Sequence, residues 1–305
     1  MKLLIANKLG ETGLDILRQQ RRVAFDYKPA VDENNLIKMI KGYEALVVRS
    51  KPLVERETIV AGRNLRVIGR AGIGLDNIDL KTAEELKIEV VNCPDANTVA
   101  AAEHAFGLMT AVARNIVIAN QSLKSGLWNR KAYVGTELFG KTLGLVGCGR
   151  IATHVAKIAH GFQMNVIGYD PFLDLNEMIK RGIQKRENLT EVLRESDIIS
   201  LHVAKTPQTI NLIGPKELAQ MKPNAILINC ARGGIVNEDA LLHALQNEQI
   251  TGAGIDVWEK EPDTNNPLQQ LPNVVATPHL GASTKEAQER VSQEIIRKVL
   301  KKLIA

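Results

Sequence analysis

Small residues in the stretch Gly147–Ala152 are spaced as in loops that bind the phosphates of a dinucleotide. Gly147 permits a tight turn after an apolar run, and Gly149 lets the backbone approach a pyrophosphate. Ala152 stands at the third position, which must be small so that a helix can pack against the strand. The N–H groups that open this helix would then donate to the phosphates.

An acidic residue gives this loop the context that confirms such a motif. Asp170 ends the apolar run Asn165–Tyr169, about 20 residues after the glycines, where the second strand of the motif should end. A carboxylate there accepts hydrogen bonds from the adenosine ribose and repels a 2′-phosphate. We therefore expect NAD rather than NADP, and a merely structural glycine turn is the weaker alternative.

A second glycine-rich segment, Gly69–Gly74, also follows an apolar run but lacks this context. Asn77 stands where a small residue is needed, and the next strand-like run, Ile88–Asn92, carries no acid at its end. We therefore predict that this segment holds no dinucleotide. Its N–H groups could bind a small anion, and a plain turn is an equally good interpretation.

Two of the six histidines follow predicted strands, at the edge where parallel sheets bind their ligands. His202 ends the run Ile198–His202, and we interpret it first as structural. His279 follows the run Val274–Ala276 and is the better candidate for an acid/base group. The other histidines fall on predicted helices, where packing or a surface position is the default, and they are His104, His154, His160 and His243.

Hydride transfer from an alcohol needs a group that takes the hydroxyl proton, and histidine suits this task near neutral pH. It also needs a cation that holds a substrate carboxylate or polarises a carbonyl, for which arginine is suited. Arg232 and Glu261 stand in loops after two further predicted strands. A carboxylate beside the histidine would stabilise its protonated form.

The three cysteines carry no predicted chemistry. No base is tied to Cys230 by the sequence, so a buried, unreactive thiol is favoured over a nucleophile, and Cys148 fills its loop. No Cys-x-x-Cys occurs and no histidine pair has metal-ligand spacing, so we expect no metal site. An odd number of cysteines indicates a reducing compartment, and we expect a cytoplasmic protein.

Short apolar runs that alternate with helical patterns must position these residues. This alternation is typical of βαβ units on a parallel sheet. We expect one uninterrupted, alanine-rich helix over about residues 97–121 and a closing helix over about residues 284–303. The expected strands are Lys2–Ala6, Arg22–Tyr27, Ala45–Arg49, Leu65–Gly69, Ile88–Asn92, Thr142–Val146, Asn165–Tyr169, Ile198–His202, Ala225–Asn229, Gly252–Asp256 and Val274–Ala276.

The length of 305 residues suits two domains, and the formal net charge of +5 is read as an ordinary lysine-rich surface. The densest basic run, Arg297–Lys302, closes an amphipathic helix, where cations suit the helix dipole. Aromatic residues make up only 4% and no dense basic cluster adjoins them, so we expect no nucleic-acid partner. The apolar run within Met1–Lys8 is too short for a signal peptide or a membrane span.

Together these motifs resemble the D-isomer-specific 2-hydroxyacid dehydrogenase family, most closely its phosphoglycerate dehydrogenase branch. The resemblance implies NAD-dependent oxidation of 3-phospho-D-glycerate, the first step of serine biosynthesis. The near alternative is a glyoxylate, hydroxypyruvate or D-lactate type of dehydrogenase, and the distant one is a non-catalytic, NAD-sensing corepressor. The matching stretches follow the family's order through nearly the whole chain: Val48–Ser50, Gly69–Asn77, Gly135–Leu138, Gly147–Ile151, Asn229–Gly234, Gly254–Pro262 and Thr277–Thr284.

The resemblance also implies roles for single residues. His279 would be the acid/base, Glu261 its partner and Arg232 the substrate anchor, while Asp256 would meet the nicotinamide amide. The implied cofactor contacts are Gly147, Gly149, Arg150, Ile151, Asp170, His202, Val203, Cys230, Ala231, Arg232, Asp256, His279 and Gly281. The implied substrate contacts are Arg49, Ser50, Arg70, Ala71, Gly72, Ile73, Asn97, Arg232 and His279, with Arg130 and Lys131 of the partner subunit.

The resemblance implies two doubly wound parallel-sheet domains. A flavodoxin-like substrate-binding domain would comprise residues 1–93 and 280–305, and a Rossmann NAD-binding domain residues 94–279. A hinge would let them close and exclude water. In the family the linking helix and the loop after it cross to a partner subunit, so we expect a homodimer.

The chain departs from the family's pattern at a few positions, which affects fine cofactor contacts more than the reaction. Ala152 replaces a glycine, and Val203-Ala204 lacks the usual proline. Trp258 replaces the usual phenylalanine, Asn237 the usual aspartate, and Ile73 a threonine of some phosphoglycerate enzymes. The sequence stops soon after the closing helix, so we expect a short form without the C-terminal regulatory domain and without serine feedback.

Overall fold

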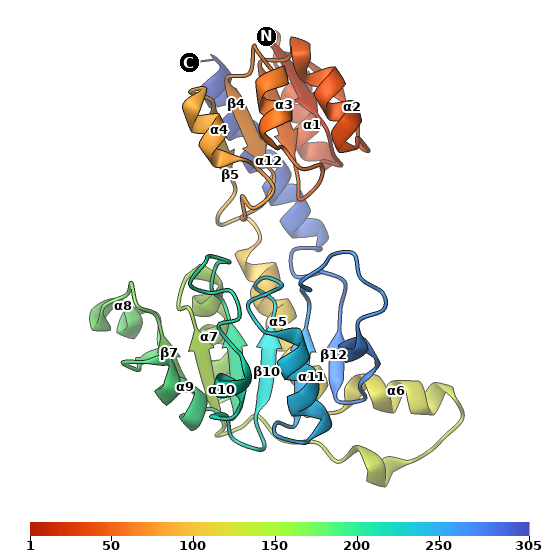
Figure 1. Cartoon of the computed structure of the whole chain (residues 1–305), viewed down its shortest axis with the longest axis vertical. Coiled ribbons are helices and arrows are strands. Elements are labelled where there is room, and N and C mark those ends of the chain that lie inside the picture. Colours follow the sequence, from red (N-terminus) through yellow and green to blue (C-terminus); the bar gives the residue numbers. More distant parts are fainter. Residues whose placement is uncertain (305) are drawn as a thin grey trace. The chain divides into compact units, whose positions relative to one another are not determined.

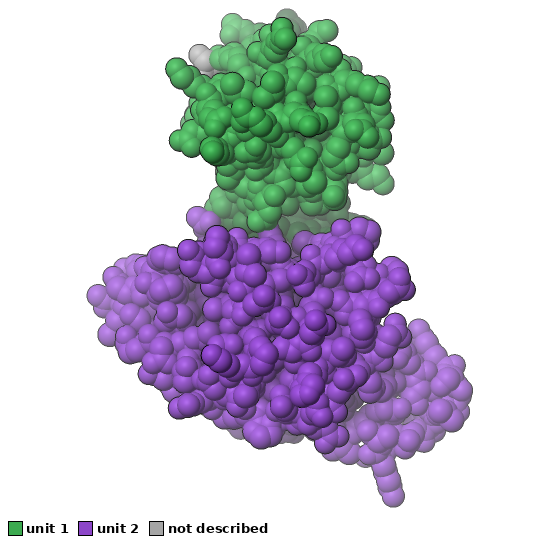
Figure 2. All heavy atoms as spheres, viewed as in Figure 1, with its two compact units in different colours: residues 1–98, 282–305 green, residues 99–281 purple. Residues whose placement is uncertain are grey.

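The computed structural model describes residues 1–304, which form two compact units. Unit 1 comprises residues 1–98 with the segment from Ala282 on, and unit 2 comprises Val99–Gly281 (Figure 2). The boundaries expected from the sequence, 93/94 and 279/280, lie a few residues away from these.

Unit 1 is built on a five-stranded sheet with the order β2-β1-β3-β4-β5, in which every neighbouring pair is parallel. This is the strand order of flavodoxin-like folds, so the predicted fold of this part is confirmed. The strands are β1 (Lys2–Ile5), β2 (Ala24–Tyr27), β3 (Ala45–Val48), β4 (Val67–Arg70) and β5 (Glu89–Asn92).

Helices cover both faces of this sheet, and one of them comes from the far end of the sequence (Figure 1). A Cβ at Gly69 in β4 would lie 2.5 Å from Val299 Cγ2 of the last helix, so this helix packs directly against the strand. The side chains of Ile295 and Val299 are fully buried there. The helices are α1 (Glu11–Arg18), α2 (Glu33–Met39), α3 (Arg56–Ala61), α4 (Leu80–Glu85) and α12 (Lys285–Ile304), with the short 3-10 helix η1 (Ile40–Gly42).

Unit 2 is built on a seven-stranded parallel sheet with the order β12-β11-β10-β9-β6-β7-β8. This is the doubly wound order of a Rossmann fold with one strand added, which confirms the predicted fold class. The two-residue strand β8 was not expected, because it carries no apolar run and pairs only with β7. The strands are β6 (Thr142–Val146), β7 (Asn165–Tyr169), β8 (Gln184–Lys185), β9 (Ile198–Leu201), β10 (Ile226–Asn229), β11 (Gly252–Ile255) and β12 (Val274–Ala276).

The expectation of one uninterrupted helix over residues 97–121 is wrong. The chain forms α5 (Thr98–Ala113) and α6 (Ile116–Lys124), and between them Asn115 takes the left-handed conformation with φ 52°. The segment around Gly135 returns against this break, where the Thr136 N–H donates to the Ala113 carbonyl at 2.8 Å. This contact takes the carbonyl that the next helical turn would need, so the helix ends.

The remaining helices of unit 2 lie between its consecutive strands in the sequence, except for one short 3-10 helix that precedes β6. None of the helices within residues 1–304 combines the length and apolar character that crossing a membrane requires. The helices are α7 (Arg150–Gly161), α8 (Leu175–Lys180), α9 (Leu189–Glu195), α10 (Pro215–Leu218) and α11 (Glu238–Gln246), with the 3-10 helices η2 (Arg130–Tyr133) and η3 (Pro267–Gln270).

Candidate active site

The loop after β6 has the conformation that its glycine pattern requires. Gly147 has φ 81°, and a Cβ there would lie 2.8 Å from the His202 carbonyl oxygen. Helix α7 begins directly after Gly149, where a Cβ would meet no atom within 4 Å. The loop is therefore closely packed on one side and open on the other, as pyrophosphate binding at a helix N-terminus requires. Ala152 is fully buried in the core beneath, where its small side chain lets the helix pack closely.

The Asp170 carboxylate directly follows β7 and turns back toward the glycine loop. Its Oδ2 accepts from the Cys148 N–H and its Oδ1 from the Phe172 N–H, both at 2.9 Å. A carboxylate oxygen can accept more than one hydrogen bond, so both oxygens can still accept from ribose hydroxyls. Open space at Gly149 and this acceptor next to it fit NAD.

Three side chains of unit 2, those of His202, Cys148 and Cys230, are held in their neutral forms. Burial lowers the pKa of His202 to about 4, and its Nε2 lies 2.9 Å from Ser200 Oγ. Burial, with a smaller effect of the Asp170 charge, raises the pKa of the Cys148 thiol to about 12. Burial likewise raises the pKa of Cys230, with the Asp256 charge adding to it. Both thiols are therefore protonated at neutral pH and poor nucleophiles.

His279 and Glu261 form a hydrogen-bonded pair. His279 Nδ1 lies 2.7 Å from Glu261 Oε2, and the Trp258 N–H donates to Glu261 Oε1 at 2.9 Å. Partial burial raises the pKa of Glu261, but the hydrogen bonds from His279 and Trp258 outweigh it and leave that pKa below its usual value. Glu261 is thus an ionised acceptor that fixes the Nδ1–H tautomer, which leaves Nε2 of the neutral ring as a proton acceptor.

The turn that carries His279 is held by Asp256, which follows β11. The Asp256 backbone carbonyl accepts from the His279 N–H at 2.8 Å. The Asp256 carboxylate accepts from the N–H groups of Leu280 at 2.7 Å and Gly281 at 2.9 Å. The sequence suggested only a nicotinamide contact for Asp256, because these contacts are made to backbone groups that no motif displays.

Arg232 lies in the loop after β10, next to the loop that carries Glu261. The Asn229 side chain shapes this loop, since its Nδ2 donates to the Arg232 carbonyl and its Oδ1 accepts from the Ala231 N–H, both at 3.1 Å. A Cβ at Gly233 would overlap the Trp258 carbonyl, so only glycine allows the two loops to lie this close. The structure thus brings the three predicted catalytic residues to one edge of one sheet, with His279 and Glu261 in direct contact.

The predicted anion-binding residues of unit 1 follow β3 and β4. Asn77 Nδ2 donates to the Arg49 carbonyl at 2.8 Å and thereby fixes the loop of Arg49 and Ser50. Burial lowers the pKa of the Arg49 guanidinium, so this cation is partly desolvated and an anionic ligand would stabilise it. A Cβ at Gly72, which has φ 149°, would overlap the Arg70 guanidinium.

Two backbone N–H groups of the 71–73 segment already donate hydrogen bonds within unit 1. The Ala71 N–H donates to the Val48 carbonyl at 2.7 Å, and the Gly72 N–H donates to the Arg70 carbonyl at 2.9 Å. Asn97 Oδ1 is buried and has no hydrogen-bond partner within residues 1–304. An unsatisfied buried acceptor of this kind is a candidate contact for a bound ligand.

Comparison with known proteins identifies the architecture that carries this site. Residues 106–281 match the family model described as "D-isomer specific 2-hydroxyacid dehydrogenase, NAD binding domain". The chain belongs to the D-isomer specific 2-hydroxyacid dehydrogenase family. The match to its NAD-binding domain confirms the cofactor expected from the glycine loop and Asp170.

Relatives with known names fall into more than one branch of this family. The chain is 44% identical over 298 residues to a D-3-phosphoglycerate dehydrogenase of Synechocystis sp., covering 98% of this chain and 53% of that relative. It is 46% identical over 276 residues to a hydroxypyruvate reductase of Thermotoga maritima, covering 90% and 89%. The chain thus spans about half the length of the phosphoglycerate relative and nearly all of the reductase.

The fold is shared with solved structures of the family. One is the D-lactate dehydrogenase of Aquifex aeolicus in complex with NAD and lactic acid, with a TM-score of 0.87 and 27% sequence identity. The likeness covers 97% of this chain and 94% of that one. The family's fold therefore extends over both units.

Proposed function

We propose that the chain catalyses NAD-dependent oxidation of 3-phospho-D-glycerate to 3-phosphohydroxypyruvate, and the reverse reaction. The observation that carries this proposal is the 2.7 Å contact between His279 Nδ1 and Glu261 Oε2, in a domain of the NAD-binding family. The phosphorylated substrate is supported by the relatives named D-3-phosphoglycerate dehydrogenase, at 44% and 45% identity.

In this proposal each residue of the site has one task. His279 Nε2 takes the proton from the substrate hydroxyl, and the Glu261 carboxylate stabilises the imidazolium that results. The Arg232 guanidinium binds the substrate carboxylate through two hydrogen bonds and so orients the reacting carbon. When bound, NAD accepts the hydride from that carbon.

The substrate phosphate would be recognised by cations of unit 1 and of a second subunit. Arg49, Ser50 and Arg70 belong to unit 1, with the Ile73 backbone and Asn97 beside them in the proposal. Phosphate is bound well by arginine because its planar group donates two parallel hydrogen bonds. Arg130 of the partner subunit, with the partner's Lys131, would complete the charge.

We propose a homodimer in which α6 and the loop after it form the interface. This segment projects from the body of unit 2 (Figure 1). It exposes large apolar side chains, among them Leu127 at 62%, Trp128 at 84% and Val134 at 80% exposure. Exposed apolar residues that cluster on one segment mark a protein-protein interface.

We also propose a cytoplasmic location, which the three free cysteines support.

A substrate panel tests the proposed reaction. Oxidation of NADH is followed with phosphohydroxypyruvate, hydroxypyruvate, glyoxylate and pyruvate at equal concentrations. We expect the highest kcat/KM for phosphohydroxypyruvate. A clear preference for hydroxypyruvate would instead identify the second candidate, a hydroxypyruvate reductase, which the 46% identity to the Thermotoga maritima relative favours.

The variant R130A/K131A separates these two candidates at the level of the site. Loss of charge-assisted hydrogen bonds to phosphate should lower kcat/KM for phosphohydroxypyruvate about 10- to 100-fold. The kcat/KM for hydroxypyruvate should change little, and Lys216→Ala, which removes an exposed cation on α10 outside the proposed interface, serves as the matched control. Equal losses on both substrates would contradict phosphate recognition by these residues.

A further inference from the structure

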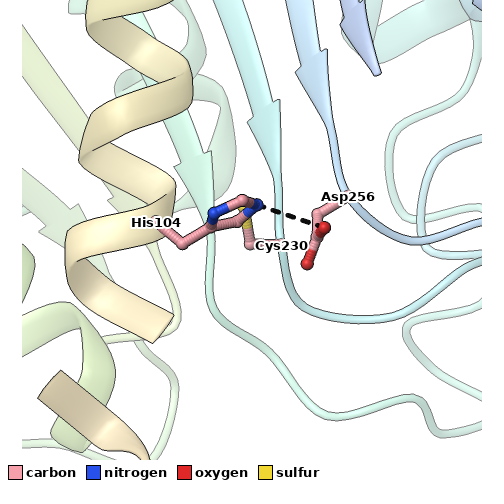
Figure 3. Close-up of side chains that lie close together, drawn as sticks. All are labelled: His104, Cys230 and Asp256. Carbon is pink, nitrogen blue, oxygen red and sulfur yellow. Dashed lines mark hydrogen bonds and ion pairs between the residues drawn. The ribbon is translucent and has the colours of Figure 1, made fainter. Parts of the chain in front are cut away.

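The imidazole of His104 contacts the Asp256 carboxylate (Figure 3). It also contacts the Thr277 hydroxyl, and these two side chains hold the catalytic turn. His104 lies on α5, and its Nε2 is 3.1 Å from Asp256 Oδ1 and 3.1 Å from Thr277 Oγ1. The sequence suggested only packing or a surface position for this histidine. The partner, Asp256, lies 152 positions away and becomes visible only in the folded chain.

Asp256 is almost fully buried, with 1% of its side chain exposed, so its carboxylate needs donors in place of water. Thr277 Oγ1 donates to Oδ1 at 2.6 Å, beside the two backbone N–H groups of Leu280 and Gly281. His104 Nε2–H is the donor that comes from a different element, the helix α5. Removing it would leave a buried charge short of one hydrogen bond.

The turn that receives these bonds holds His279 in an uncommon backbone conformation. His279 has φ 56°, in the left-handed region that residues other than glycine rarely adopt. Such a conformation persists only where surrounding contacts over-determine it. The contacts of Asp256 with His279, Leu280 and Gly281 provide these constraints.

We propose that His104 is a positioning residue for the reaction. Its Nε2–H fixes the Asp256 carboxylate, which fixes the turn 277–281, and this turn aims the His279 imidazole. This inference rests on the acid/base role of His279 in the proposed function. A displacement of a catalytic group by about 1 Å can cost about 10²-fold in rate, so a contact that touches neither substrate nor cofactor can still control turnover.

His104 and Asp256 also form a cluster with Cys230, in which each residue brings one possible metal-ligand atom to within 4.8 Å of the others. This cluster therefore has the composition of a metal site. The hydrogen bonds favour a different interpretation. Asp256 Oδ1 already accepts from His104, Thr277 and Leu280. Burial raises the pKa of Cys230, which keeps its sulfur protonated rather than metal-binding.

The variants H104Q and H104L test the proposal. Glutamine places an N–H donor close to the position of Nε2, whereas leucine fills the space without a donor. We expect kcat for H104L to fall about 10-fold or more with little change in substrate KM, and we expect H104Q to recover most of the loss. Thr110→Val on the same helix, which removes only a bond to the Phe106 carbonyl, should keep wild-type kcat.

Hydrogen exchange gives a readout that does not depend on turnover. Amides of the turn 277–281 should exchange about 10-fold faster in H104L and at nearly the wild-type rate in H104Q and Thr110→Val. If the wild type reduces no acid of the panel, the proposed function fails, while the exchange rates still decide the positioning role. Thr277→Val, which removes another donor to Asp256, should show the same acceleration even if H104L does not fold.

Three results would overturn the proposal. One is a wild-type kcat and wild-type amide exchange rates in H104L. Another is an equal loss of kcat in H104L and H104Q. The third is inhibition of the wild type by added zinc chloride that disappears in both H104L and Cys230→Ser, because the cluster would then act as a metal site.

Discussion

At the scale of single residues, we propose that Asp170 determines which cofactor the glycine loop accepts. Its carboxylate lies beside the Cys148 and Phe172 N–H groups, so it is held in place before any ligand arrives. A fixed negative charge repels the 2′-phosphate of NADP. The family match identifies an NAD-binding domain, and this residue is the physical reason we assign to that choice.

Asp170→Ser should therefore relax the cofactor preference. We expect the ratio of kcat/KM for NADH to that for NADPH to fall at least about 10-fold, because the repulsion and the ribose hydrogen bonds are both lost. Steady-state kinetics with each cofactor measure this ratio. Asp174→Asn, which retains the cap on α8, is the control and should leave the ratio unchanged. An unaltered ratio in Asp170→Ser would remove Asp170 from cofactor selection.

The residue scale also shows how much of the site the sequence could reveal. His279, Glu261 and Arg232 could be chosen because they follow strands in loops, and their side chains are of the types that this chemistry needs. His104 and Thr277 could not be chosen, because their importance lies in contacts with Asp256 made across the fold. In the sequence, Trp258 was noted only as a departure from the family's pattern. Its backbone N–H donates to the Glu261 carboxylate, and its indole N–H donates to the Thr277 carbonyl.

At the scale of elements, the loops after β10 and β11 must lie in close contact to build the site. Gly233→Ala tests this contact, because a Cβ there would overlap the Trp258 carbonyl. We expect loss of about 1–3 kcal/mol of stability, as is typical of overpacking, together with a clear fall in kcat. Denaturant unfolding and NADH oxidation measure the two effects.

Gly161→Ala is the matched control for this glycine. It ends α7, and a Cβ there would meet no atom within 4 Å. Replacement of a helical glycine by alanine is favourable by about 0.5–1 kcal/mol in a helix interior, so this variant should be as stable as the wild type or slightly more so. If both variants behaved alike, the contact of Gly233 with Trp258 would not constrain the site.

The elements themselves were largely predictable, and the exceptions have physical causes. Buried parallel strands are continuous apolar runs, so β3 and β10 stand out in the sequence. The break between α5 and α6 depends on a segment that returns from residue 135, which local helix propensity cannot detect. Strand β8 forms because β7 has an edge to pair with, and its own two residues give no signal.

At the scale of the whole molecule, the fold favours the deprotonated forms of His202, Asp256 and Glu261, so acid destabilises it. The pKa of His202 is lowered by burial from 6.5 to about 4, so the unfolded chain takes up a proton here before the folded chain does. The lowered pKa values of Asp256 and Glu261, each opposed by burial but dominated by hydrogen bonds, act at still lower pH. For all three groups the linked stability is present at high pH and is lost as pH falls.

Thermal stability should therefore decrease as pH falls from 6.5 to about 4. Part of this change arises because His202 takes up a proton in the unfolded chain but not in the folded one. The loss should continue below pH 4 as the two carboxylates are protonated. Melting temperatures across this range measure the slope, and His202→Gln should flatten it between these limits. His243→Gln, at an exposed position of α11, should not. A stability independent of pH in this range would contradict a His202 that stays neutral in the folded chain.

The central claim is that His279 is the acid/base of an NAD-dependent dehydrogenase, and one comparison tests it most directly. The rate of NADH oxidation with phosphohydroxypyruvate is measured for the wild type, for His279→Gln and for His160→Gln, whose exposed histidine contacts the Gly182 carbonyl. We predict a loss of about 10²- to 10⁴-fold in kcat for His279→Gln and wild-type kcat for His160→Gln. Near-full turnover in a correctly folded His279→Gln variant would contradict the account.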